Sequence, residues 1–326
     1  IEAADANLDA SIHNYDAVLV CLLAEVATEY TTIRTTQQRL AYARENVRTQ
    51  EGSLDLSQKQ ADAGQADYAG VELASSRLHS TRALIPELEI QLRLANNRLC
   101  TLLGTPTRDL VLELAPGGIP MGPPEVAVGI PADLRRRRPD SNSAERRIAH
   151  QSASIGIAIT DLYPHFSLTG NVNWGSEKLS TLLSGDASGG AFGPSLRWDL
   201  LNYGRIVNNV ELQRQVFGEL ITSYRNTVLT ANQEVEDSLV AFLRNQERAT
   251  ELQASVDATS NALELLLSQY KEGETDFTGV FVMQRELVQL QERLAQTQGD
   301  VATSLIGVYT ALGGGWEIRR QGCGRK

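Results

Sequence analysis

The residues best suited to chemistry in this chain stand in patterns that match no reactive or metal-binding site. The three cysteines form an odd set without CxxC spacing, and the four histidines show neither an HExxH motif nor paired-ligand spacing. No nucleophile beside a base and no phosphate-binding loop is found, so the sequence predicts neither an enzyme nor a bound cofactor or metal. These cysteines and histidines are Cys21, Cys100, Cys323, His13, His79, His150 and His165.

The cysteines and the charged residues have simpler expected roles. Cys21 and Cys100 lie in helical patterns and are expected to be small core residues. The 40 acidic and 30 basic residues give a formal net charge of -10, which argues against nucleic acid as a partner because phosphate contacts need a basic surface. The run Arg135 to Arg138 is expected to form a solvated patch near an acidic neighbour rather than a ligand site.

Two runs within residues 163–203 alternate apolar and polar side chains with a period of two, which predicts two β-strands. Each run has the ~9–11 residues that a tilted strand needs to cross a bilayer, and tryptophans suit the membrane interface. A soluble hairpin packed on a core is the alternative. The predicted membrane-facing side chains are Phe166, Leu168, Val172, Trp174, Phe192, Leu196, Trp198 and Leu200.

Long helices must position this strand pair. Apolar residues recur every seven positions in residues 1–62, from Ile12 to Leu54, which is typical of a coiled-coil seam. A similar pattern fills residues 205–271, and a helix of that length would span roughly 100 Å. The chain contains no stretch of 18 apolar residues, so no membrane-spanning helix is expected.

Two glycine-containing turns are predicted to end these helices and to begin the return helices. Gly64 and Gly273 fit helix C-terminal positions, and Asp67 and Asp276 fit N-caps worth about 1 kcal/mol each. Glu272, Glu274 and Asp276 make the second turn acidic. A solvated turn is the expected interpretation, and a preference for cationic cargo or basic partner residues is the alternative.

The two helical hairpins align at a constant offset of 209 residues. Gly64 corresponds to Gly273, Asp67 to Asp276 and Gly104 to Gly313, without a gap between residues 15 and 104. Agreement at both turns and both ends indicates an internal repeat. The strand pair would map upstream of residue 1, so we expect a missing N-terminal section with two strands and an export signal.

The sequence thus predicts a mainly α fold with a membrane β-hairpin and long antiparallel coiled-coil hairpins in two repeats. Because two or four strands cannot close a barrel in lipid, several copies must each contribute a segment. The expected segments are a first helical hairpin (1–104), a Pro-rich linker (105–140), a short helix (141–162), the strand pair (163–203), a second helical hairpin (204–313) and a tail (314–326).

Three groups of motifs carry a resemblance to a known family. The first is G-I-P-A-D-L-R-R-R-R-P-D (129–140) with A-E-R-R-I-A (144–149) and S-I-G-I-A (154–158). The others are L-Y-P-H-F-S-L-T-G (162–170) with F-G-P-S-L-R-W (192–198), and A-L-G-G-G-W (311–316). In combination they resemble the TolC-like outer-membrane efflux factors, and most of all the NodT-type lipoprotein branch that serves resistance-nodulation-division pumps.

The resemblance implies a homotrimeric outer-membrane channel of a Gram-negative bacterium, with a twelve-strand β-barrel and a helical α-barrel that extends into the periplasm. It implies a passive exit duct for drugs or other small toxic compounds. The implied partners are outer-membrane lipid, a periplasmic adaptor protein and an inner-membrane pump. A type I protein-secretion channel and a soluble coiled-coil scaffold are the alternatives.

The resemblance also places the adaptor contact at the two helical turns. In this family the turns at the far periplasmic end meet the adaptor and form the closed entrance of the tunnel. The corresponding adaptor-facing residues are Gly64, Gln65, Asp67, Tyr68, Gly273, Glu274, Asp276 and Phe277.

Overall fold

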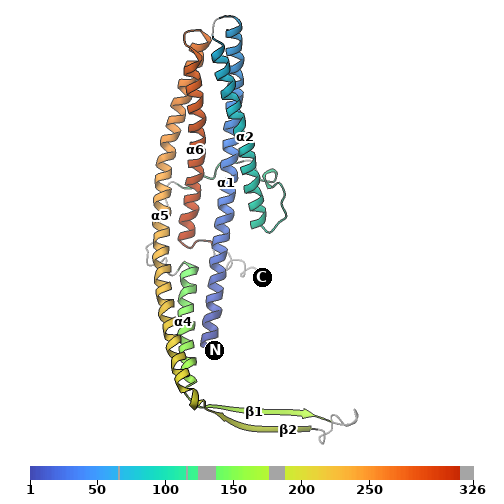
Figure 1. Cartoon of the computed structure of the whole chain (residues 1–326), viewed down its shortest axis with the longest axis vertical. Helices are drawn as coiled ribbons and strands as arrows, with labels where there is room; N and C mark the ends of the chain where they lie inside the picture. Colours follow the sequence, from blue (N-terminus) through green and yellow to red (C-terminus); the bar gives the residue numbers. More distant parts are fainter. Residues whose placement is uncertain (65–66, 115–116, 124–136, 176–187, 316–326) are drawn as a thin grey trace. The chain divides into compact units, whose positions relative to one another are not determined.

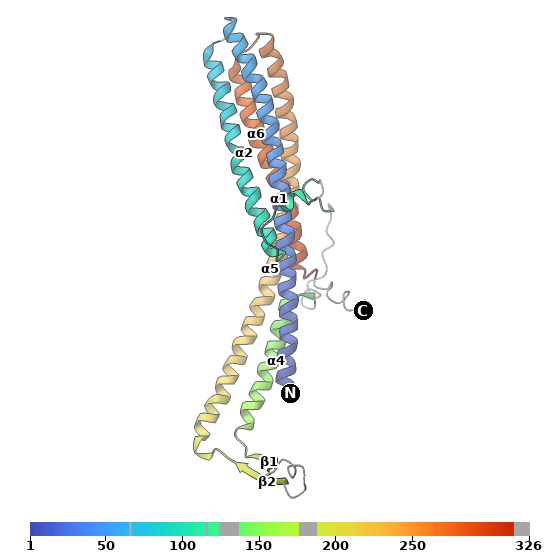
Figure 2. The same cartoon turned by 90° about the vertical axis from the view of Figure 1, so that its right-hand side faces the viewer.

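The computed structural model describes residues 1–64, 67–114, 117–123, 137–175 and 188–315 (Figures 1 and 2). These residues fall into two compact units. The first combines Ile1–Asn14 with Asp140–Val228, and the second combines Tyr15–Pro139 with Leu229–Lys326. The two longest helices, α1 (Glu2–Asp62) and α5 (Tyr203–Lys271), contribute to both units. Each unit is therefore described by itself.

The second unit is built from four long helical segments. α2 (Tyr68–Leu102) and α6 (Phe277–Ala311) run alongside the parts of α1 and α5 in this unit, and α6 lies between α5 and α1 (Figure 1). Heptad positions form the main core, as predicted. Its buried side chains include Val256 and Leu263 of α5 and Val280, Leu287 and Leu294 of α6. A short 3₁₀ helix, Leu110–Leu112, follows α2.

The helix ends agree with the predicted capping residues. Gly64 and Gly273 have φ angles of 72° and 76°, in the left-handed region that glycine enters without steric cost. The Oδ1 atoms of Asp67 and Asp276 accept hydrogen bonds from the backbone N–H of Ala69 and Thr278, so both aspartates are N-caps. Both turns lie at the same end of the second unit (Figures 1 and 2).

The first unit holds the short helix and the strand pair. α4 (Pro139–Thr160) is fastened to the first residues of α1, because Ser143 Oγ donates to the Ala10 carbonyl and His150 Nδ1 bonds the Ala3 carbonyl. β1 (His165–Trp174) pairs with β2 (Ser188–Arg197) in an antiparallel register that sets Phe166 opposite Leu196. A second 3₁₀ helix, Leu200–Asn202, leads into α5.

Several sequence predictions need correction. Trp198 and Leu200 lie beyond β2, which begins at Ser188 rather than near Phe192, because pairing with β1 extends through Gly190 and Gly189. Asp140 lies inside the first turn of α4 instead of preceding that helix. Cys100 is buried as expected, but Cys21 is exposed on α1.

Other predicted features fall partly outside the described residues. Arg135, Arg136, Gln65 and most of the 129–140 motif lie outside them, and so does the tail from residue 316, with Cys323. Among the helices that the structure describes, none combines the length and the apolar character needed to cross a membrane.

Candidate functional site

The first helical turn joins α1 to α2 and presents an aromatic ring to solvent. Tyr68 is exposed, and its hydroxyl donates a hydrogen bond to Asp62 Oδ1 at 3.1 Å. This hydrogen bond and the negative charge of Asp62 raise the pKa of Tyr68 above its ordinary value, so the ring stays neutral. The turn therefore offers a neutral phenol beside a carboxylate.

The second turn joins α5 to α6 and turns its aromatic ring inward. Phe277 is buried and packs edge-on against Tyr270, with ring centroids 5.4 Å apart. The Tyr270 hydroxyl donates to Ser57 Oγ at 3.1 Å, and Gln60 Nε2 donates to the Tyr270 carbonyl at 2.9 Å. These bonds tie the end of α5 to α1, so the second turn is the more firmly held of the two.

A groove of about 670 Å³ lies between the two turns. Its walls combine both N-cap aspartates with backbone and apolar groups, and its lining includes Asp67, Gly70, Leu73, Gly273, Thr275 and Asp276. A Cβ added at Gly70 would lie 3.4 Å from Phe277 Cβ, so the two return helices begin in van der Waals contact. The groove thus has a floor where α2 and α6 meet and acidic caps on both sides.

The strand pair has one apolar and one polar face. Phe166, Leu168, Val172 and Trp174 alternate along β1 with Ser167, Thr169, Asn171 and Asn173, and all of these are exposed. The cross-strand partners of Phe166 and Gly170 are Leu196 and Phe192, which continue the same apolar face. On the polar face the hydroxyls of Ser167 and Ser195 lie 2.6 Å apart. A continuous exposed surface of large apolar side chains marks a site that contacts a membrane or a partner protein.

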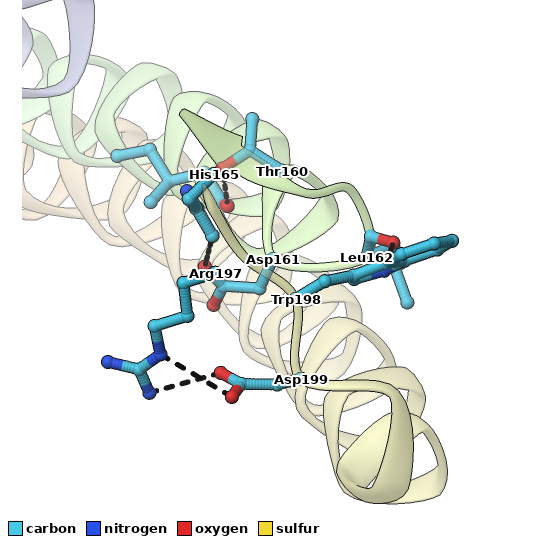
Figure 3. A network of polar contacts seen from close by, with 8 residues as sticks. Thr160, Asp161, Leu162, His165, Arg197, Trp198 and Asp199 are labelled. Atoms are coloured by element: carbon cyan, nitrogen blue, oxygen red, sulfur yellow. Dashed lines mark hydrogen bonds and ion pairs between the residues drawn. The ribbon is translucent and has the colours of Figure 1, made fainter. Parts of the chain in front are cut away.

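Charged groups gather only at the base of the hairpin, among the described residues of both strands (Figure 3). Arg197 donates to Asp199 through Nε and Nη2, at 3.4 and 3.1 Å, and His165 Nε2 lies 3.6 Å from Asp161 Oδ1. Trp198 Nε1 donates to the Leu162 carbonyl at 3.3 Å, which ties the end of β2 to the end of α4. Figure 3 shows these contacts joining both strand ends to the helical segment.

Arg138, from the arginine run, is buried instead of solvated. Its Nη1 donates to Glu234 Oε2 at 2.8 Å and to the Ala311 carbonyl at 2.9 Å. The expectation of an acidic neighbour is therefore confirmed, whereas the expectation of a solvated patch is wrong for this residue. The guanidinium reaches the last turn of α6, where a positive charge is favoured by the helix dipole.

A polar seam between α1 and α6 was not predicted. Asn46 Nδ2 donates to Gln291 Oε1 at 2.6 Å, and Gln284 Nε2 donates to Ser53 Oγ at 2.8 Å. Further along, the Thr35 side chain packs against the backbone of Gly299. Thr35, Asn46 and Ser53 lie outside the seven-residue apolar repeat of α1, so the sequence pattern gave no signal for this seam.

The predicted adaptor-facing residues are therefore brought together, but in two environments. Gly64, Asp67, Gly273, Glu274 and Asp276 lie at or beside the groove end of the second unit, and Tyr68 is exposed there. Phe277 is a core residue. Of the predicted membrane-facing residues, six lie on the described strands, and Trp198 and Leu200 follow them.

Comparisons with known proteins identify the family. Residues 1–105 and 130–314 match the family described as "Outer membrane efflux protein". Nodulation protein T of Rhizobium leguminosarum bv. viciae is 32% identical over 320 residues, which cover 97% of this chain and 65% of that protein. The outer membrane protein OprJ of Pseudomonas aeruginosa is 30% identical, over 93% of this chain and 64% of its own length.

A solved structure of the outer-membrane channel OprN has the same fold, with a TM-score of 0.88 and 30% identity over 97% of this chain and 71% of that chain. The chain thus spans about two thirds of the length of these relatives. The predicted family, the outer-membrane location and the prediction that the chain is not an enzyme agree with these matches. On this evidence, the chain belongs to the TolC-like outer membrane efflux protein family.

Proposed function

We propose that this chain is the subunit of a homotrimeric duct through which small toxic compounds leave the cell as part of a tripartite efflux system. The observation that carries the proposal is the strand pair. It exposes an apolar face of membrane-crossing length on one side and uncharged polar side chains on the other, in a chain of this family. Outer-membrane strands alternate in this way between lipid and a water-filled lumen.

Each strand has ten residues, about the length that a tilted strand needs to cross the hydrocarbon core. In the proposed barrel, Phe166, Leu168 and Val172 face lipid, and Ser167, Thr169 and Asn171 line the lumen. A two-stranded sheet leaves backbone groups unpaired at both edges, which lipid cannot satisfy. Copies of the chain must therefore supply neighbouring strands, and three copies are what the family implies.

The long helices form the proposed periplasmic part. Under this proposal residues 1–104 and 204–313 are two equivalent helical hairpins, joined by the linker 105–140 and the short helix 141–162. The helices of three copies would form an α-barrel around water. The main core of the four helical segments is apolar, and many of the exposed positions on the same helices are polar.

The two turns are the proposed docking site for a periplasmic adaptor, which would connect the duct to an inner-membrane pump. The groove between the turns supports this assignment, since it offers an apolar floor at Leu73 and carboxylates at Asp67 and Asp276. Such a site would accept an apolar helix tip with basic flanks. Replacing Gly273 by valine, at a φ of 76°, should strain the turn and impair coupling to the pump.

The test uses the full-length protein in mild detergent. A trimer by light scattering, and ion conductance after reconstitution into a planar bilayer, are the expected results. Leu168→Asp should prevent membrane insertion, whereas Thr169→Asp, on the opposite face at the same depth, should still insert and should alter ion selectivity. A detergent-independent monomer without conductance would overturn the proposal.

A further inference from the structure

The two helical hairpins correspond residue by residue, which allows their surroundings to be compared. α2 and α6 each contain 35 residues, and both their first and their last residues are 209 positions apart. The glycines that follow the helices correspond as well, because Gly104 and Gly313 have φ angles of 66° and 72°. Adding 209 to a residue of α1 or α2 therefore gives its equivalent in α5 or α6.

Within the chain, α6 covers one side of α1. The contact is antiparallel, because Thr35 packs on Gly299, Asn46 bonds Gln291 and Ser53 bonds Gln284. A Cβ added at Gly299 would lie 3.2 Å from Thr35 Cβ, which shows how closely the two helices approach. As a result, α1 is buried on nearly every side between Thr31 and Thr36.

No described residue covers the equivalent stretch of α5 in this way. Thr31 is 2% exposed, but its equivalent Val240 is 49% exposed. Arg34 is 5% exposed, but its equivalent Leu243 is 46% exposed. A surface groove of about 420 Å³ runs along this side of α5, lined by Val240, Leu243, Arg244, Gln246, Glu247 and Thr250. The helix that should cover it is the equivalent of α6, which is α2.

The equivalent covering face of α2 is also exposed in the part of the chain that the structure describes. Gly299 and Thr303 of α6 correspond to Ile90 and Leu94 of α2, which are 61% and 63% exposed. Glu87 lies on the same stripe, one turn before Ile90, and is exposed. The spacing of four, three and four residues from Ala83 to Leu94 keeps the stripe on one face of the helix.

We propose, on the basis of the proposed trimeric duct, that α2 of one copy covers α5 of the next copy in the register that α6 and α1 use within the chain. Leu94 then packs on Val240, Ile90 packs beside Arg244, and Glu87 lies within reach of Arg248. The two seams differ in chemistry. In the seam within the chain the facing side chains are polar and the two helices approach each other closely. In the seam between copies the facing side chains are apolar, with an ion pair at the edge.

This difference follows from the side chains. Ile90 stands where Gly299 allows close approach, so α5 and the partner's α2 must lie further apart, and the larger space is filled by Val240, Leu243 and Leu94. Glu87 and Arg248 of α5 carry opposite charges, whereas Arg244 is already paired with Glu247 of its own helix at 2.7 Å. Since the two faces lie on different helices of one chain, the contact is head-to-tail, and in the proposed trimer it closes into a ring.

The test starts with charge reversal in the full-length protein. Glu87→Arg places a second arginine beside Arg248 and should raise the concentration at which copies dissociate by roughly tenfold or more. Arg248→Glu in the same chain should restore the trimer. Glu89→Arg is the matched control, because Glu89 lies on the other side of α2 in an exposed pair with Arg44 and should change little.

Cross-linking tests the register. Leu94→Cys with Val240→Cys, in a chain where Cys21 and Cys323 are serine, should form covalent dimers and trimers with a short bismaleimide, and either single cysteine should not. If the wild-type protein is a trimer but Glu87→Arg leaves it intact and no cross-link forms, the assigned contact is wrong while the duct proposal stands. A wild-type monomer would overturn both.

Discussion

The guanidinium of Arg138 and the carboxylate of Glu234 lie 2.8 Å apart, and the same Nη1 also reaches the Ala311 carbonyl at 2.9 Å. One side chain thus joins the residue before α4 to the body of α5 and to the last turn of α6. Gly313 leaves room for this arrangement, because a Cβ there would lie 3.0 Å from Arg138 Cα. The bond connects the end of the linker to both helices of the second hairpin.

Removing this guanidinium should destabilise the second unit. Arg138→Met would leave the Ala311 carbonyl and a half-buried carboxylate without their donor, and should lower the free energy of unfolding by about 1–3 kcal/mol. Thermal unfolding of the detergent-solubilised protein measures the effect. Arg44→Met, which breaks an exposed pair with Glu89, should cost only about 0–1 kcal/mol. Equal losses in the two variants would contradict the structural role of Arg138.

The close approach of α1 and α6 can be tested at Gly299. An alanine there would overlap the Thr35 hydroxyl, so Gly299→Ala should lower stability by about 1–3 kcal/mol despite its better helix propensity. Thr35→Ala should recover part of that loss in the double variant. Gly218→Ala, where nothing lies within 4 Å, should instead raise stability by up to about 1 kcal/mol. Stabilisation by Gly299→Ala would argue against the packing described.

The second turn depends on its N-cap. Asp276 accepts from the N–H of Thr278 at 3.1 Å and from its hydroxyl at 3.2 Å. Asp276→Ala should destabilise the start of α6 by about 0.5–2 kcal/mol, whereas Asp276→Asn should retain most of the capping. Hydrogen exchange at residues 277–281 is the direct measurement. Unchanged exchange in the alanine variant would show that packing of Phe277 alone holds this turn.

Stability should depend on the protonation of Glu29. Burial raises the pKa of this carboxyl above its ordinary value of 4.5, against the opposing effect of Arg98, whose Nε lies 2.9 Å from Oε1. Because the folded state holds this proton more tightly than the unfolded state, this group makes stability fall as the pH rises from 4.5 through the folded pKa. Glu29→Gln should remove that slope.

The measurement for Glu29 is the unfolding temperature as a function of pH, compared between the wild type and Glu29→Gln. A matched control is Glu45→Gln, an exposed residue paired with Arg48 on the same helix, which should leave the profile unchanged. An identical slope in the wild type and Glu29→Gln would show that Glu29 does not contribute to the pH dependence.

Much of the fold could be predicted because its signals are local. Heptads, turn glycines and cap aspartates act within a few residues, and they located both hairpins and their turns. The end of β2 was predicted less well, because the pairing register rather than the sequence alternation decides where a strand stops.

Burial of polar groups depends on contacts far along the sequence, so the sequence did not reveal it. Arg138 bonds Glu234 nearly one hundred positions away. Asn96 is another such residue, since it donates to the Arg108 carbonyl at 2.7 Å and accepts from the Leu110 N–H at 2.9 Å after a turn of the chain. An isolated asparagine or arginine in a helical pattern gives no indication of such a partner.

The equal length of α2 and α6 restricts how such a protein can change. One inserted residue turns every later side chain of a helix by about 100°. In α2 such an insertion would remove Ile90 and Leu94 from their common face, and in α6 it would displace Gly299 from Thr35. Insertions and deletions are therefore tolerable mainly as whole heptads, added to or removed from both helices of a hairpin. The lengths of such ducts should then differ in steps of about 10 Å.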